Sequence, residues 1–174
     1  MLEQVAFEFE PVFRQKQLHC RLQLPARMEA VCDIDKIERV FDNLLRNAAS
    51  YATPGSEISV TGSTDDAGLL LQFENPGPTI PPEKLSRIFE QFYRLDTSRA
   101  SSTGGAGLGL AIARQIVEAH GGQISASSQE ETVRFTVWLP APAGQQEKAA
   151  PARPEDPAGR PAPSGADSPH PQAG

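Results

Sequence analysis

The segment most suited to chemistry is rich in glycine: Gly104, Gly105, Gly107 and Gly109 are four glycines within six positions. Glycines allow successive backbone N–H groups to turn toward one anion, and a helix that begins there adds unpaired amide donors and the positive end of its dipole. Apolar residues continue at helical spacing through 108–119, which predicts such a helix. The pattern predicts a phosphate-binding loop, although a tight turn or a flexible lid would show the same glycines. The P-loop motif with its lysine is absent from the sequence.

A second candidate site is the asparagine pair Asn43 and Asn47, four residues apart along the edge of an amphipathic helical pattern that Asp33 or Asp35 would cap. The apolar face of this pattern consists of Ile37, Val40, Phe41, Leu44, Leu45 and Ala48. Asparagine is a poor helix former, so the pair needs a reason. The amides could be solvated or bonded across a turn. Alternatively, their carbonyl oxygens could reach a hard cation such as Mg²⁺ on a nucleotide.

Composition limits the classes of function. A chain of 174 residues with 39% hydrophobic and 22% charged residues is expected to form one domain. A net charge of −6 argues against nucleic acid or an anionic membrane surface as the main partner. Cys20 and Cys32 lack metal-ligand spacing, which favours buried thiols in a reducing compartment. A reducing compartment indicates a cytoplasmic chain, and with no membrane-spanning run and no signal peptide in the sequence we expect the chain as given to be soluble.

The elements that must position these residues follow from hydrophobic periodicity. Helical patterns cover 2–16 (with a break at Pro11), the segment after Asp35, 81–92 and 108–119. Alternating patterns predict strands at 18–24, 30–32, 57–63, 69–73, 123–128 and 133–139. Together they predict an α+β fold, a two-layer α/β sandwich whose mixed sheet of about five strands is covered on one face by three helices. From Pro140 onward the chain is dominated by Pro, Ala and Gly, so we expect 141–174 to be a disordered tail.

Four motifs in this order resemble a known family, the catalytic ATP-binding domain of sensor histidine kinases, whose Bergerat-type fold is shared with gyrase, Hsp90 and MutL. The motifs are Asp42–Ala48, similar to the family's N box; Asn75–Ile80, similar to its first glycine box; Ile88–Arg94, similar to its F box; and Gly105–Leu110, similar to its second glycine box. The runs at 89–96 and 102–107 look most like vancomycin-resistance sensors of the VanS type. The resemblance covers 1–140, and it implies that 1–16 continue from an upstream dimerisation and phosphoacceptor domain that this sequence lacks.

The resemblance also implies roles for individual residues, with ATP and Mg²⁺ as cofactors. Asn43 and Asn47 are implied to hold Mg²⁺, and Arg94 and Asn43 are the implied catalytic residues, with Arg94 on the terminal phosphate. Tyr51 and Tyr93 are implied to flank the base or the ribose. The full set implied to bind the nucleotide is Asn43, Asn47, Tyr51, Asn75, Gly77, Ile80, Tyr93, Gly105, Gly107, Leu108 and Gly109. Such a site works by positioning and charge neutralisation, which is most of what phosphoryl transfer requires.

The sequence departs from the family pattern at several positions. Asn75 stands where the family usually has the Asp that accepts from the adenine amino group, so adenine selectivity is expected to be weaker. Ser50 replaces a basic residue near the phosphates. Thr79 replaces a glycine of the first box, and the turn at Glu130–Glu131 lacks the glycines often found there. These departures bear on nucleotide affinity more than on the fold.

A glutamate that activates water in the ATP-hydrolysing relatives is replaced here by Asn43, and an amide cannot act as a general base. Transfer to a protein nucleophile therefore fits better than hydrolysis. His19, His120 and His170 lack the sequence context of the family's acceptor histidine. We expect a protein-histidine kinase domain, monomeric in isolation, whose partners are an upstream histidine-bearing domain and a response regulator, with any membrane link through missing upstream segments. The alternatives are a nucleotide-binding regulatory module and an ATPase of the gyrase, Hsp90 and MutL kind.

Overall fold

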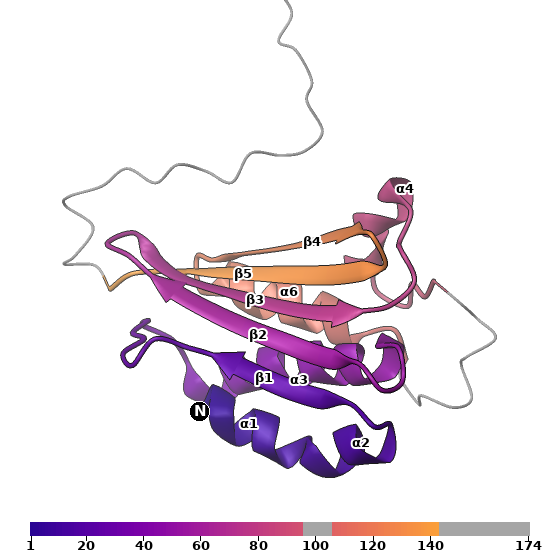
Figure 1. The fold of residues 1–174 in the computed structure, drawn as a ribbon. Helices are drawn as coiled ribbons and strands as arrows, with labels where there is room; N and C mark the ends of the chain where they lie inside the picture. Colours follow the sequence, from indigo (N-terminus) through magenta and orange to yellow (C-terminus); the bar gives the residue numbers. More distant parts are fainter. Residues whose placement is uncertain (96–105, 143–174) are drawn as a thin grey trace, which may run out of the picture.

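The computed structural model describes residues 1–95 and 106–142, which form a five-stranded sheet with helices packed against it (Figure 1). The strands are β1 (His19–Gln23), β2 (Glu57–Thr64), β3 (Gly68–Pro76), β4 (Gln123–Gln129) and β5 (Thr132–Pro140). Their order is β1-β2-β3-β5-β4; β1 runs parallel to β2 and the other pairs are antiparallel. The predicted mixed sheet is thus confirmed. Most of the predicted tail, 143–174, lies outside the described residues, as do 96–105.

One face of the sheet carries the hydrophobic core. Alternate residues along β3 and β5 are buried, and the register places Phe73 opposite Phe135 and Leu71 opposite Val137. Because side chains alternate between the two faces of a strand, these buried residues all point toward the same layer of helices.

The helical layer consists mainly of two helices that lie side by side behind the sheet, α3 (Ile34–Tyr51) and α6 (Gly109–Ala119) (Figure 1). The short helix α1 (Leu2–Glu8) packs against α3, and α2 (Glu10–Gln15) lies next to the edge strand β1. The predicted break near Pro11 is confirmed, because the chain restarts as α2 with this proline in its first turn. In the parts of the chain that the structure describes, no helix has the length and apolar character needed to cross a membrane.

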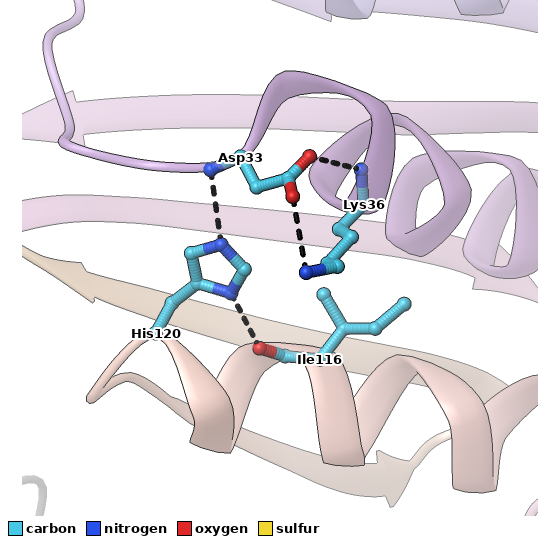
Figure 2. A network of polar contacts seen from close by, with 4 residues as sticks. All are labelled: Asp33, Lys36, Ile116 and His120. Carbon is cyan, nitrogen blue, oxygen red and sulfur yellow. Dashed lines mark hydrogen bonds and ion pairs between the residues drawn. The ribbon is translucent and has the colours of Figure 1, made fainter.

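A polar contact ties the end of α6 to the start of α3 (Figure 2). The Nε2 atom of His120 accepts the Asp33 backbone N–H at 3.0 Å, while Nδ1 lies 2.7 Å from the Ile116 carbonyl oxygen. Asp33 is the N-cap of α3, and its carboxylate accepts the backbone N–H of Lys36 and pairs with the Lys36 ammonium. The hydrogen bonds from Lys36 and the charge of its ammonium group lower the pKa of Asp33. Both ring nitrogens of His120 are engaged in fixing the two helices.

Two predicted elements are wrong. The segment 81–92 is not one helix: α4 (Pro82–Leu85) is followed by the 3₁₀ turn η1 (Arg87–Phe89), after which the chain extends at Glu90 and Phe92 adopts a φ of 64°. Tertiary contacts explain the break, because the Phe92 backbone N–H donates to the Gly107 carbonyl. The segment 30–32 forms no strand. A strand needs a hydrogen-bonding neighbour, and this segment instead leads into the cap of α3.

Candidate functional site

The structure contains a cavity of about 320 Å³ that is lined by five segments far apart in the sequence. They are the second half of α3, the end of β3 with the loop and α4 that follow it, η1 with the segment after it, the start of α6 with the glycine before it, and the first half of β5. The lining residues are Asn43, Arg46, Asn47, Ser50, Tyr51, Asn75, Gly77, Pro78, Thr79, Ile80, Pro81, Lys84, Ile88, Tyr93, Arg94, Leu95, Gly107, Gly109, Leu110, Val133 and Phe135. A concave site with apolar walls and a few polar groups is typical of small-molecule binding.

Helix α3 contributes one continuous face to the cavity. The lining residues of this helix follow the i, i+3, i+4, i+7, i+8 spacing of a single helical face, and they are Asn43, Arg46, Asn47, Ser50 and Tyr51. The adjoining face of α3 is buried in the core, with Leu44 and Leu45 fully inaccessible to solvent. Core packing therefore determines which way the two asparagines point.

The glycine-rich segment allows α6 to begin very close to Asn43. A Cβ atom added at Gly109 would lie 2.8 Å from Asn43 Oδ1, so a residue with a side chain would displace this amide. Gly107 has a φ of +72°, and its carbonyl accepts the Phe92 backbone N–H at 3.0 Å. The end of the glycine loop is thereby fixed between α3 and the segment that carries Tyr93 and Arg94.

Three hydrogen bonds fix the loop after β3 to the hairpin of β4 and β5. The Gly77 backbone N–H donates to the Glu131 carbonyl at 2.7 Å, and the Ile80 backbone N–H donates to Ser128 Oγ at 2.9 Å. In return, the Glu131 backbone N–H donates to Thr79 Oγ1 at 3.0 Å. Thr79, which departs from the family pattern, thus uses its hydroxyl to hold the hairpin turn.

The charged side chains that line the cavity in the described residues are all positive. Arg46, Lys84 and Arg94 line it, whereas the described lining residues include no aspartate or glutamate. Arg46 also pairs with Asp42 at 2.9 Å and lies over the ring of Phe9. The described residues contain no cluster of three or more His, Cys, Asp and Glu side chains that could hold a metal ion alone. The cavity is therefore suited to a polyanion.

Most of the residues that the sequence predicted for the site lie around this cavity: Asn43, Asn47, Tyr51, Asn75, Gly77, Ile80, Tyr93, Arg94, Gly107 and Gly109. Leu108 is not among the lining residues, and Gly105 lies outside the described residues. Their roles in binding stay predictions.

Sequence reasoning did not assign every lining residue to the site; Arg46, Lys84, Val133 and Phe135 are among those it missed. Arg46 was detectable, because it lies three residues after Asn43 on the same helical face. Lys84 had a weaker signal, since its direction depends on the short helix α4. The two β5 residues could not be assigned to the cavity without the strand order.

The histidines of the described residues have other surroundings. His19 is exposed on β1, and His120 is engaged between α6 and α3. His170 lies outside the described residues. Neither His19 nor His120 lines the cavity.

Comparison with known proteins agrees with this geometry. Residues 32–143 match the family described as histidine kinase-, DNA gyrase B- and HSP90-like ATPases. The chain is 48% identical over 143 residues to the sensor protein VanSC of Enterococcus gallinarum, across 82% of this chain and 39% of that protein. The chain therefore spans well under half of the length of that relative. This identity confirms the resemblance to VanS-type sensors.

Two solved structures show the same fold. The nucleotide-free catalytic domain of the histidine kinase ThkA has a TM-score of 0.70 at 28% identity, across 80% of this chain and 89% of that chain. ThkA in complex with the response regulator protein TrrA has a TM-score of 0.68 at 26% identity, across 80% of this chain and 39% of that chain. The chain belongs to the family of histidine kinase-, DNA gyrase B- and HSP90-like ATPases, and within it to the ATP-binding catalytic domains of two-component sensor histidine kinases.

Proposed function

We propose that this domain binds ATP with Mg²⁺ in the cavity between α3 and α6 and transfers the γ-phosphoryl group to a histidine on a separate helical domain. The phosphoryl group then passes to an aspartate of a response regulator. The observation that carries the proposal is the lining of the cavity, which combines three cationic side chains and an asparagine pair with no carboxylate among its described residues.

The absence of a carboxylate from the described lining residues favours transfer over hydrolysis. Activation of water needs a general base, and the amide of Asn43 cannot accept the proton. A protein nucleophile brings its own reactive nitrogen, so the domain only needs to position the triphosphate and neutralise its charge. Arg94 is suited to the terminal phosphate because a planar guanidinium matches the spread negative charge of the transferring group.

The asparagine pair fits a magnesium site. Amide oxygens are hard ligands, and Mg²⁺ is often held by one or two protein groups together with phosphates and water. Asn43 Oδ1 lies against the start of α6, close to where a phosphate would meet the backbone amides of that helix. Asn43 and Asn47 would hold the ion, which would neutralise charge on the phosphate oxygens.

The base end of the nucleotide would lie among the apolar and aromatic lining residues. Tyr51 and Tyr93 are far apart in the sequence but line the same cavity. The guanidinium of Arg87 lies over the Tyr93 ring, 4.4 Å from its centroid. This cation–π contact favours the observed orientation of the Tyr93 ring. Asn75, Gly77 and Ile80 complete this end of the site in the proposal.

The proposed partners follow from the relatives. ThkA has been solved with a response regulator, and VanSC is a sensor protein. We expect this domain to work in the cytoplasm, where ATP is available, beside a dimerisation domain that carries the phosphoacceptor histidine.

The test uses the full chain with ATP labelled at the γ-phosphate. A helical histidine domain from a related VanS-type sensor is added in trans, together with a version in which the acceptor histidine is replaced by alanine. A histidine kinase would label the domain that carries the acceptor histidine and would leave the alanine version unlabelled. It would also release free phosphate more slowly than it labels the histidine domain. Rapid release of free phosphate without any acceptor would instead indicate an ATPase, and binding without either reaction would indicate a regulatory module.

A further inference from the structure

Asn75 is the one buried polar residue among the described residues, with 2% of its surface exposed. It lies near the end of β3, where the register pairs it with Val133 of β5, and both residues line the cavity. Within the described residues its side chain makes a single hydrogen bond, from Nδ2 to the Pro76 carbonyl at 3.3 Å. A carboxamide has two donors and two acceptor lone pairs, so most of its capacity is left for a ligand.

The surroundings of Asn75 suit a flat heterocyclic ring. The apolar side chains of Ile80, Val133 and Phe135 line the same cavity, and each of them is buried. No charged residue belongs to this group; the cations of the cavity come from α3, α4 and the segment after η1. A ring that enters this apolar region would find the amide of Asn75 as its buried polar contact.

Among the described residues, a single long hydrogen bond fixes the orientation of the Asn75 amide. Its bond to the Pro76 carbonyl is long, and the same carbonyl accepts the Thr53 backbone N–H at 2.9 Å. If the amide rotates by 180°, this bond is lost and Oδ1 comes to face the Pro76 carbonyl, which keeps the Thr53 donor; hydrogen bonds from a ligand to the rotated amide must offset that cost. The rotation exchanges the positions of Oδ1 and Nδ2, so the same side chain can present an acceptor or a donor to the ligand.

We infer that Asn75 makes the nucleotide site tolerant of the group at position 6 of a purine, so that it takes 6-oxopurine triphosphates as well as ATP. This inference depends on the proposed function, because it concerns the base of the nucleotide bound there. The edge of adenine offers an amino donor beside an acceptor nitrogen, and the edge of hypoxanthine offers an oxo acceptor beside an N–H donor. One orientation of the amide matches the first edge, and the other orientation matches the second. A carboxylate at this position would match adenine alone, because it only accepts hydrogen bonds.

Calorimetric titration of the full chain in the presence of Mg²⁺ tests this inference. The probes are the β,γ-imido analogues of ATP and ITP, which differ only at the 6-position edge of the base. The wild-type chain is expected to prefer the adenine analogue by less than about tenfold. Asn75→Asp is expected to raise that preference by at least about tenfold, because its carboxylate would face the oxo group without a donor.

A second variant keeps the test decisive if Asn75→Asp does not fold, which circular dichroism would show. Asn75→Ser retains a group that both donates and accepts, so it is expected to keep the weak preference of the wild type. A wild-type preference for the adenine analogue above about tenfold, or an unchanged preference in a folded Asn75→Asp, would overturn the inference and leave the proposed function intact. Failure of the wild-type chain to bind either analogue would overturn the proposed function itself.

Discussion

The contact between Asn43 and Gly109 joins the two halves of the site at the scale of single residues. The asparagine comes from the inner helix α3, and the glycine begins α6, sixty-six positions later in the sequence. The approach leaves no room for a Cβ atom, which would lie 2.8 Å from Asn43 Oδ1. Any other residue here would have to displace the Asn43 amide, in addition to any effect on the phosphate-binding role that the motif predicts.

We predict that Gly109→Ala weakens nucleotide binding by about tenfold or more while the domain stays folded. The added methyl group would displace the Asn43 amide, and a displacement of about 1 Å in a positioning group can cost about a hundredfold in activity. Gly109 is the first residue of α6, and the group that must move is the end of a side chain, so the thermal midpoint should change little. Titration with an ATP analogue and a thermal melt measure the two effects. Gln115→Ala, on the exposed face of the same helix, is the matched control, and equal affinity of the two variants would contradict the argument.

Cys20 allows a second prediction at this scale. Burial raises the pKa of its thiol from 9.0 to about 11, with smaller contributions from the charges of Glu10 and Glu57. Because the folded pKa lies above the unfolded value, the thiol contributes stability below pH 9 that is lost as the pH rises toward 11. In a Cys32→Ser background, native Cys20 should react with iodoacetamide at pH 8.5 at least about tenfold more slowly than in urea, since the thiolate is the reactive form. Equal rates in the two states would show that the thiol is neither buried nor shifted.

At the scale of elements, the hairpin turn between β4 and β5 supports the loop after β3. Glu130 and Glu131 both have positive φ, 47° and 55°, and together form a two-residue connection. Such turns normally use asparagine and glycine because other residues are strained in this conformation. In this strained conformation the Glu131 carbonyl accepts from the Gly77 N–H and the Glu131 N–H donates to Thr79 Oγ1, so the turn holds the loop after β3.

We predict that Glu131→Gly stabilises the domain by about 1 kcal/mol, because glycine adopts a positive φ without the steric cost of a Cβ atom. The backbone N–H and C=O of residue 131 are kept in this variant, so the loop after β3 should stay in place. Denaturant unfolding gives the free energy of unfolding. Glu131→Ala is the control, since alanine retains the Cβ atom and should give no gain; a similar gain in both variants would indicate that the charge of Glu131, and not its backbone, is responsible.

Hydrophobic periodicity predicted the helices and strands that bury one continuous face. The apolar face of α3 and the alternating faces of β3 and β5 each follow one clear period, and the structure confirms them. On α6 the expected stripe of Leu108, Ala111, Ile112, Ile116 and Ala119 is only partly confirmed. Ala111 is buried, but Ala119 is exposed, and the buried face also carries Ala113 and Val117. Small residues occur around this whole helix, so hydrophobicity alone does not choose its buried side.

The segment 81–92 shows a different reason for failure. Leu85, Ile88, Phe89 and Phe92 have helical spacing, but Phe92 is 70% exposed. The bond from its backbone N–H to Gly107 requires an extended chain before it, and that bond joins residues fifteen positions apart. A pattern read over one helical window cannot include such a contact.

At the scale of the whole molecule, the site exists because the sheet order brings distant segments to one place. β3 lies between β2 and β5, so the loop that follows β3 meets the β4–β5 hairpin and the helices behind it. His120 fixes the end of α6 to the cap of α3 at the other end of the helical pair (Figure 2). The motifs predicted which segments matter, but Val133, Phe135 and Lys84 could be assigned only once these long-range pairings were known.

The central claim is that the face of α3 in this cavity binds a magnesium nucleotide. It is tested most directly by calorimetric titration of the full chain with a non-hydrolysable ATP analogue, with and without Mg²⁺. The wild-type chain and Asn47→Ala are compared with Arg39→Ala, whose exposed side chain lies on α3 but outside the cavity. Binding to the wild-type chain should depend on Mg²⁺. It should weaken by about tenfold or more in Asn47→Ala, since the loss of a metal ligand or of its support typically costs that much. Binding should be unchanged in Arg39→Ala. Absence of binding to the wild-type chain at millimolar nucleotide, or equal binding by Asn47→Ala, would contradict the claim.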